Sequence, residues 1–211
     1  MPRPTFFNLP QAKQQKVIES IISEFSQYPL SQGSVARIVK KADIARGSFY
    51  QYFDDLEDAY YYVLGLVGEK KMTYLRPILH ASPDLPVMDL FKRLFRAGVQ
   101  FGAEHPQLAK MGALFLQEEK RIRQEVVAEE EEGAIRFYHD LLMKGKQTGE
   151  IASDLDLHMA AFVLFHSQMA LMERALKQME WEEGSDVLQE FMTEFDHMLE
   201  LILYGIIRRE S

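Results

Sequence analysis

Residues 46–52 combine side chains that can hydrogen-bond both to the edges of base pairs and to the phosphates of nucleic acid. The set consists of Arg46, Gly47, Ser48, Tyr50, Gln51 and Tyr52. A guanidinium can bind guanine with two hydrogen bonds, an amide can bind adenine in the same way, and hydroxyl groups reach phosphate oxygens. The glycine permits close approach of the backbone. The segment therefore favours nucleic-acid recognition, provided that a helix presents these groups together.

Two short helices joined by a tight turn are predicted to position this segment. Ser31 or Ser34 can cap a helix over residues 35–42, and residues 43–45 are too few for anything but a turn. A helix over residues 46–52 then has Phe49 and Phe53 on its inner face. This arrangement is that of a helix-turn-helix, in which the first helix braces against phosphates and the second enters the major groove.

The rest of the chain has the periodicity of helices. A helix is expected from Pro10 to about Gln27, and a long one from Leu56 toward Leu79, where Pro77 should break it. Further helices are expected over residues 86–104, 106–116, 119–146, 156–179 and 185–208. No stretch alternates with the period of a strand for long enough to predict a sheet, so the expected fold class is all-α.

Charge is distributed unevenly along the chain. The 211 residues have a formal net charge of −8, but residues 1–53 hold seven basic and three acidic side chains, a balance of +4 that leaves −12 for the rest. A basic segment on an acidic chain indicates one end that binds a polyanion. The absence of cysteine excludes disulfides, zinc ribbons, iron–sulfur clusters and thiol catalysis. No signal peptide or membrane-spanning stretch is visible, so we expect a cytoplasmic protein without a membrane partner.

The helix-turn-helix segment resembles that of the tetracycline-repressor (TetR) family of bacterial transcriptional regulators. The resemblance rests on residues 34–42 (SVARIVKKA) and 43–53 (DIARGSFYQYF), and extends over about residues 10–60. It implies a three-helix DNA-binding domain over residues 1–55 and a larger helical domain for ligand binding and dimerisation over residues 56–211. Taken singly, Tyr50 and Tyr52 are better explained by packing and Arg46 by a surface charge, but their order after a turn favours DNA binding.

The resemblance also assigns roles within the segment. It implies that Arg46, Gly47 and Gln51 face bases, and that the remaining residues contact the DNA backbone. These are Ser34, Arg37, Ser48, Tyr50 and Tyr52. The chain departs from the family pattern at Asp43, Ala45 and Leu56. Because Leu56 stands where the family usually has a lysine, Lys40 and Lys41 are candidates to supply the missing phosphate contact.

The C-terminal helices are predicted to form a homodimer. Residues 159–165 are apolar on every side, which suits a helix between its own domain and a partner. The last helix has a wider apolar face than one packing contact uses, and a four-helix bundle built from two helices of each subunit would bury it. The residues expected at the interface are Phe165, Leu188, Phe191, Phe195, Met198 and Ile202.

A small-molecule effector is the third expected partner, beside the DNA operator and the second subunit. Helices that surround a cavity in the TetR family here include methionine and aromatic side chains, which suit an apolar or aromatic ligand. The candidates are Met111, Phe115, Tyr138, Met143, Phe162, His166 and Met169. Simple core packing is the alternative reading of each.

These features predict a repressor that leaves a pseudopalindromic operator when it binds its effector, with the helix from Leu56 as the lever between domains. No cofactor and no enzymatic activity are expected. The first alternative is a metal-binding helical-bundle enzyme, since Glu194 and His197 have the Glu-x-x-His spacing of di-iron sites, but no second copy of that motif exists. The other alternative is a helical protein-interaction module, which leaves the basic segment unexplained.

Overall fold

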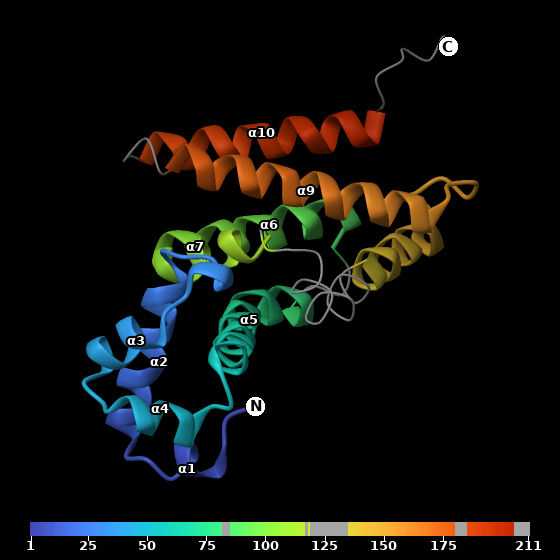
Figure 1. The fold of residues 1–211 in the computed structure, drawn as a ribbon. Helices are drawn as coiled ribbons and strands as arrows, with labels where there is room; N and C mark the ends of the chain where they lie inside the picture. Colours follow the sequence, from blue (N-terminus) through green and yellow to red (C-terminus); the bar gives the residue numbers. More distant parts are fainter. Residues whose placement is uncertain (82–84, 117, 119–134, 180–184, 205–211) are drawn as a thin grey trace. The chain divides into compact units, whose positions relative to one another are not determined.

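The computed structural model describes residues 1–81, 85–116, 118, 135–179 and 185–204, and within these ranges all regular structure is helical (Figure 1). The elements are α1 (Pro4–Phe7), α2 (Gln11–Phe25), a 3₁₀ turn (Leu30–Gln32), α3 (Val35–Ala42), α4 (Arg46–Tyr52), α5 (Leu56–Ala81), α6 (Val87–Glu104), α7 (Pro106–Leu116), α9 (Leu157–Met179) and α10 (Ser185–Tyr204). Residues 135–148 are helical as well. The all-α prediction is confirmed.

The chain divides into two compact units. Unit 1 comprises residues 1–76 and 100–126, and unit 2 comprises residues 77–99 and 127–211. The DNA-binding helices predicted from the sequence therefore share a unit with most of α5 and with α7. No helix in the described ranges has both the length and the apolar character needed to cross a membrane.

The predicted break at Pro77 is wrong, because α5 continues through this residue to Ala81. Proline inside a helix removes one backbone hydrogen bond and favours a bend, but flanking residues with good helical propensity can carry the helix onward. Residues 78–81 remain helical in the structure. The boundary between the two units nevertheless falls at Arg76 and Pro77, where that hydrogen bond is lost.

Aromatic side chains fill the interior of unit 1. Phe25 packs edge-to-face on Tyr60 with 4.6 Å between ring centroids, and Phe49 lies 5.4 Å from Phe53. Gly33 is needed where α2 meets the start of α5, because a Cβ there would lie 2.8 Å from Phe25 Cε1. A larger residue at this position would push α2 away from the turn that leads into α3.

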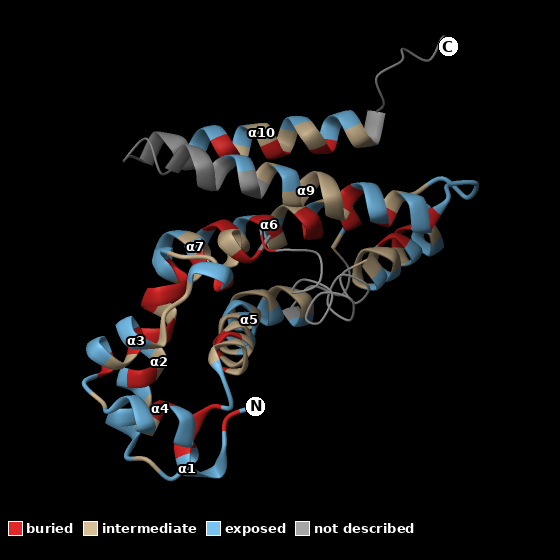
Figure 2. Cartoon of the chain, viewed as in Figure 1, coloured by how far each residue is buried: buried red, intermediate tan, exposed pale blue. Residues whose placement is uncertain are grey.

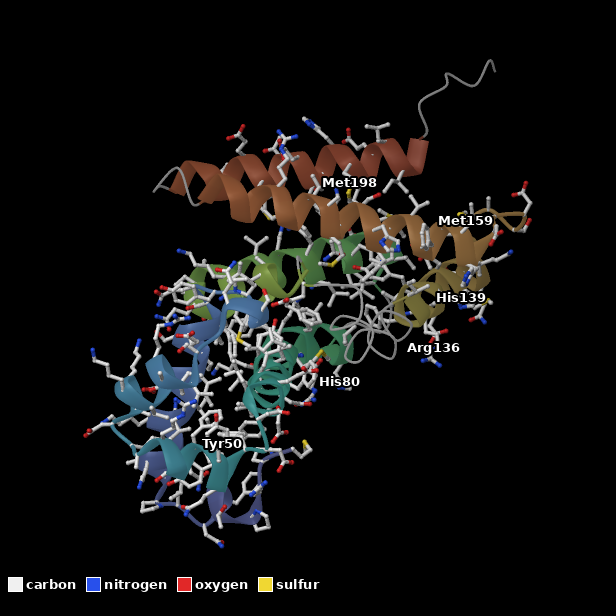
Figure 3. All side chains as sticks on the ribbon, viewed as in Figure 1. Tyr50, His80, Arg136, His139, Met159 and Met198 are labelled. Atoms are coloured by element: carbon white, nitrogen blue, oxygen red, sulfur yellow. The ribbon has the colours of Figure 1, made fainter. Side chains whose placement is uncertain are left out.

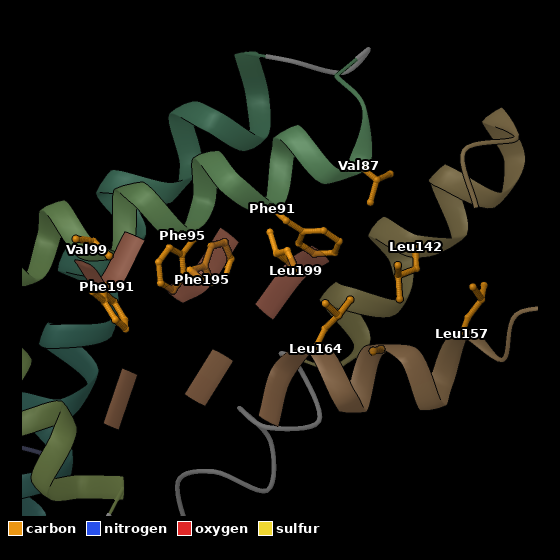
Figure 4. Close-up of a cluster of buried hydrophobic side chains, with 11 residues drawn as sticks. Val87, Phe91, Phe95, Val99, Leu142, Leu157, Leu164, Phe191, Phe195 and Leu199 are labelled. Carbon is orange, nitrogen blue, oxygen red and sulfur yellow. The ribbon is translucent and has the colours of Figure 1, made fainter. Parts of the chain in front are cut away.

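Unit 2 has its own apolar cluster, formed by α6, α9, α10 and residues 135–148 (Figure 4). Phe95 of α6 stacks on Phe195 of α10 with 3.4 Å between centroids and 4° between planes. Phe191 also contacts Phe95, at 5.1 Å. The expectation that Phe191 and Phe195 lie at a dimer interface needs correction, because the fold of a single chain already covers both side chains. Leu188 lies outside the residues whose side chains are described.

Candidate nucleic-acid interface

The turn between α3 and α4 is set by local backbone chemistry. Ser34 is the N-cap of α3, and its hydroxyl accepts the Arg37 backbone N–H. Asp43 ends α3 in the left-handed conformation, with φ 57° and ψ 51°. Aspartate tolerates this conformation better than most residues, so Asp43 can stand where the family pattern has glycine. The predicted bounds 35–42 and 46–52 are confirmed by α3 and α4.

The recognition helix α4 has one buried and one exposed face (Figure 2). Phe49 is fully buried, as is Phe53 just beyond the helix. Both side chains therefore hold α4 against the rest of unit 1, as expected. The exposed face carries Arg46, Gly47, Tyr50 and Gln51, and Ser48 is half-buried beside it. Tyr50 is labelled on this helix in Figure 3, and its ring lies edge-on to Phe49.

Open space surrounds Gly47, since nothing lies within 4 Å of a Cβ added there. The glycine is therefore not required by packing within the chain. An open backbone on the exposed face of α4 instead leaves room for a bound partner to approach closely, as the sequence predicted.

Tyr52 lies elsewhere than the sequence suggested. Tyr52 is 5% exposed and its ring packs 6.0 Å from Phe6, so it belongs mainly to the core. The expectation that it reaches the DNA backbone as an exposed side chain needs correction. Tyr52 follows Phe49 by three residues, so both side chains lie on the buried face of α4.

Arg37 is held by partners within the chain. Its Nε donates to both carboxylate oxygens of Glu24, at 2.9 and 3.0 Å, and its Nη2 donates to the carbonyl of Gln32 at 2.7 Å. The guanidinium also lies over the Tyr28 ring, 4.1 Å from its centroid. These hydrogen bonds to Glu24 raise the pKa of Arg37 above its ordinary value. Arg37 thus ties α3 to α2, and only part of its exposed side chain is available to a phosphate.

Glu24 is the buried member of this pair. Its carboxylate is 5% exposed, and it also accepts the Ser34 backbone N–H at 2.8 Å. One carboxylate therefore fixes both the start of α3 and the arginine in its first turn. A buried carboxylate is tolerated only with such partners. Sequence reasoning missed Glu24, because its partners lie ten and thirteen residues away on another helix.

Basic side chains lie on the last turn of α3 and at the start of α4. Lys40 and Lys41 are exposed on the last turn of α3, and Arg46 begins α4. Lys41 also hydrogen-bonds the Ser23 hydroxyl, so Lys40 is the freer of the two lysines to reach a phosphate. The arrangement of a braced first helix, a tight turn and an exposed polar second helix is that of a DNA-binding helix-turn-helix.

Comparison with known proteins agrees with this geometry. The family model described as bacterial regulatory proteins, tetR family, matches residues 17–58. A TetR family transcriptional regulator from Chloroflexus aurantiacus J-10-FL is 31% identical, with 95% of this chain and 90% of that chain covered and a TM-score of 0.68. The chain belongs to the TetR family of transcriptional regulators. The helix-turn-helix of this TetR-family chain is its DNA-binding element.

Two fatty-acid regulators share the TetR fold. The fatty acid degradation regulator FadR from Bacillus halodurans is 21% identical, with 96% of this chain and all of that chain covered and a TM-score of 0.73. FadR from Bacillus subtilis, solved in complex with stearoyl-CoA, is 20% identical over 92% of this chain and 99% of that chain, with a TM-score of 0.69. No protein with a curated description matches the chain.

The residues predicted to line an effector site fall in both units of the TetR-family chain. Met111 and Phe115 are buried in unit 1, whereas Tyr138, Met143, Phe162, His166 and Met169 belong to unit 2. The ring centroids of Phe162 and His166 lie 4.2 Å apart. Phe162 is 44% exposed and Met143 is 37% exposed. The expectation that these two line an enclosed interior needs correction, because each lies on the outer face of its helix.

The metal-enzyme alternative receives no support from the described residues. Glu194 forms an ion pair with Arg174 at 2.8 Å, and His197 is exposed. Within the described ranges, no three histidine, cysteine, aspartate or glutamate side chains are grouped closely enough to hold a metal ion. TetR-family membership accounts for the chain as a transcription factor.

Proposed function

We propose that the protein is a homodimeric repressor that binds a pseudopalindromic operator through α4 and leaves it when a small effector binds. The observation that carries the proposal is the exposed polar face of α4, held in place by Phe49 and Phe53. Two such helices bind successive major grooves only if the dimer holds them about 34–36 Å apart, one turn of DNA. We also propose that residues 1–55 bind DNA and that residues 56–211 bind the effector and the second subunit.

The exposed apolar face of α9 supports dimerisation. Leu157, Ala161 and Leu164 face the interior of unit 2, while Met159, Phe162 and Val163 are 56%, 44% and 39% exposed. These three share the opposite side of α9, and Met159 is labelled there in Figure 3. Contiguous exposed apolar side chains usually mark an interaction surface. A second copy of α9 and α10 would bury them in a four-helix bundle.

The interior of unit 2 supports an apolar or aromatic effector. Tyr138 stacks on Phe91, with 5.4 Å between centroids, and its hydroxyl donates to Gln168. Burial raises the pKa of Tyr138 above its ordinary value. Aromatic surface with a few polar groups is typical of sites for largely apolar ligands. Since the B. subtilis FadR was solved with stearoyl-CoA, long-chain acyl compounds are the first effectors to test.

A buried carboxylate in unit 1 offers a route from the larger domain to the helix-turn-helix. Glu118, just beyond α7, is 5% exposed and accepts the Leu30 backbone N–H. Leu30 begins the 3₁₀ turn that leads into α3. Burial raises the pKa of Tyr60 well above its ordinary value, and the negative charge of Glu118 adds to this effect. A displacement of α7 would therefore act directly on the turn before α3.

Removing the Glu118 carboxylate is expected to loosen that turn. Glu118→Ala leaves the buried Leu30 N–H without an acceptor, which costs about 1–3 kcal/mol of free energy of unfolding. Glu118→Gln keeps an acceptor oxygen and serves as the control. Hydrogen exchange at the Leu30 amide is expected to accelerate in the alanine variant only. Equal exchange in Glu118→Ala and wild type would show that the carboxylate does not hold the turn.

Selection of binding sites from random duplex DNA by the purified protein tests the proposed function. We expect enrichment of an inverted repeat whose half-site centres lie about 10 base pairs apart. Addition of a long-chain acyl compound to the selected complex is then expected to release the DNA. Folded protein that enriches no sequence would overturn the proposal.

A further inference from the structure

The recognition helix α4 has only seven residues, Arg46–Tyr52, and no side chain caps its N-terminus. Isolated helices of this length are not stable in water, because the entropy lost in forming the first turn exceeds the gain from so few hydrogen bonds. The last carbonyl groups of any helix also lack partners within the helix. Something outside α4 must therefore hold its C-terminal end.

Residues 3–7 supply partners for two of those carbonyl groups. The backbone N–H of Arg3 donates to the carbonyl oxygen of Tyr52 at 2.8 Å. The hydroxyl of Thr5 donates to the carbonyl oxygen of Gln51. Both bonds join residues more than 45 positions apart in sequence. The helix α1 thus acts as a C-terminal cap for the recognition helix.

Apolar packing fixes α1 in this position. Phe6 is fully buried, and its ring lies 5.2 Å from Phe53, 6.0 Å from Tyr52 and 5.6 Å from Tyr62. Burial of one phenylalanine side chain is worth about 1.5–3 kcal/mol, far more than an exposed contact. One aromatic side chain therefore anchors α1 to the end of α4 and to the first turns of α5.

An ion pair on the surface also joins the start of α1 to the residues that follow α4. Arg3 Nε donates to Asp54 Oδ1 at 2.9 Å, and both side chains are about half exposed or more. Exposed pairs contribute little stability. The pair does, however, place a cation beside the acidic residues that follow α4.

We propose that residues 3–6 are positioning residues for DNA recognition: they hold the C-terminal end of α4, which carries Tyr50 and Gln51, in the conformation that binds the operator. A frayed end would leave only a fraction of the molecules competent to bind, and the apparent dissociation constant rises by the inverse of that fraction. This inference rests on DNA binding by α4 and adds residues that do not themselves touch the bases.

The matched pair Thr5→Val and Thr5→Ser tests the proposal. Valine keeps the shape of threonine but cannot donate to the Gln51 carbonyl, whereas serine can. One lost hydrogen bond of ordinary strength predicts an operator affinity weaker by up to about 5-fold for each recognition helix in Thr5→Val. Thr5→Ser should remain within about 2-fold of wild type. Amide exchange at residues 50–53 in the free protein should accelerate in Thr5→Val alone.

The salt dependence of binding separates positioning from direct contact with DNA. A positioning role predicts that the slope of log affinity against log salt concentration is unchanged in Thr5→Val and in Arg3→Gln, since no phosphate contact is lost. A slope reduced by about one for each subunit in Arg3→Gln would overturn the positioning role of that residue. Selective binding by wild type with unchanged affinity and exchange in Thr5→Val would overturn this inference alone. Absence of selective binding by wild type would overturn the proposed function as well.

Discussion

Arg46→Ala is expected to weaken binding to the operator by about 5- to 150-fold for each half-site while leaving binding to unrelated DNA nearly unchanged. Arg46 begins the exposed face of α4, where its guanidinium is free to bind a base edge with two hydrogen bonds. Loss of such a bidentate contact costs about 1–3 kcal/mol of discrimination against the wrong base. The effect should therefore appear as a lower ratio of specific to nonspecific affinity.

Lys40→Ala is the matched control for this measurement. Lys40 is also an exposed basic residue of the helix-turn-helix, but it lies on α3 and is expected to contact phosphate. Its loss should weaken binding to all sequences alike and lower the salt slope by about one for each subunit, or about two for the dimer. If Arg46→Ala behaves in the same way as Lys40→Ala, Arg46 does not read bases and the assignment of α4 as the reading helix is wrong.

Phe162→Glu is expected to split the dimer and weaken operator binding by about 100-fold or more. The side chain of Phe162 is 44% exposed on the outer face of α9, so a single folded chain can accept the charge. In the proposed dimer the same charge would be buried without a partner, which is strongly unfavourable. A monomer engages one half-site at a time and loses the gain from linking two binding events.

Light scattering and operator titration together check this prediction. Wild type is expected at twice the chain mass of 24.5 kDa, as a dimer. Phe162→Glu is expected at 24.5 kDa, as a monomer. Gln147→Glu adds the same charge at another exposed position of unit 2 and should leave both mass and affinity unchanged. Phe162→Glu protein that remains dimeric would place the interface on another surface.

Local sequence signals predicted the helix-turn-helix well. The serine cap at Ser34, the aspartate at Asp43 and the spacing of Phe49 and Phe53 act over a few residues, so their consequences can be read without the rest of the chain. These signals defined the bounds of α3 and α4. The same reasoning identified the exposed residues of α4, because its inner face is apolar and its outer face is not.

Partners distant in sequence decided the remaining features. Arg37 has the chemistry of a phosphate ligand, but its Nε and Nη2 already donate to Glu24 on α2 and to the carbonyl of Gln32. Tyr52 lies in the core because Phe6, 46 residues earlier, packs on it. Phe195 belongs to the apolar face of α10, and only the stacked ring of Phe95 shows that this side of the helix faces inward. Hydrophobic periodicity predicts the width of the apolar face of a helix, but not which part of the protein or of a partner packs against it.

Helix α1 was not predicted at all. Four residues are too few for periodicity to show, and the segment is stable only because α4 and α5 receive Phe6. Pro4 near the start of the helix was the one available local signal, since proline is favoured in the first turn. The prediction of a helix break at Pro77 was wrong for a different reason. The general rule that proline ends a helix was applied there, but α5 continues through this residue.

Titration of the selected inverted repeat and of a scrambled duplex with wild-type protein, at one stated salt concentration, tests the central claim most directly. A dimer that reads bases through α4 predicts two chains per duplex and an affinity for the repeat about 1000-fold or more above that for the scrambled sequence. Equal affinity of the folded protein for both duplexes would contradict the claim that the exposed face of α4 recognises a DNA sequence.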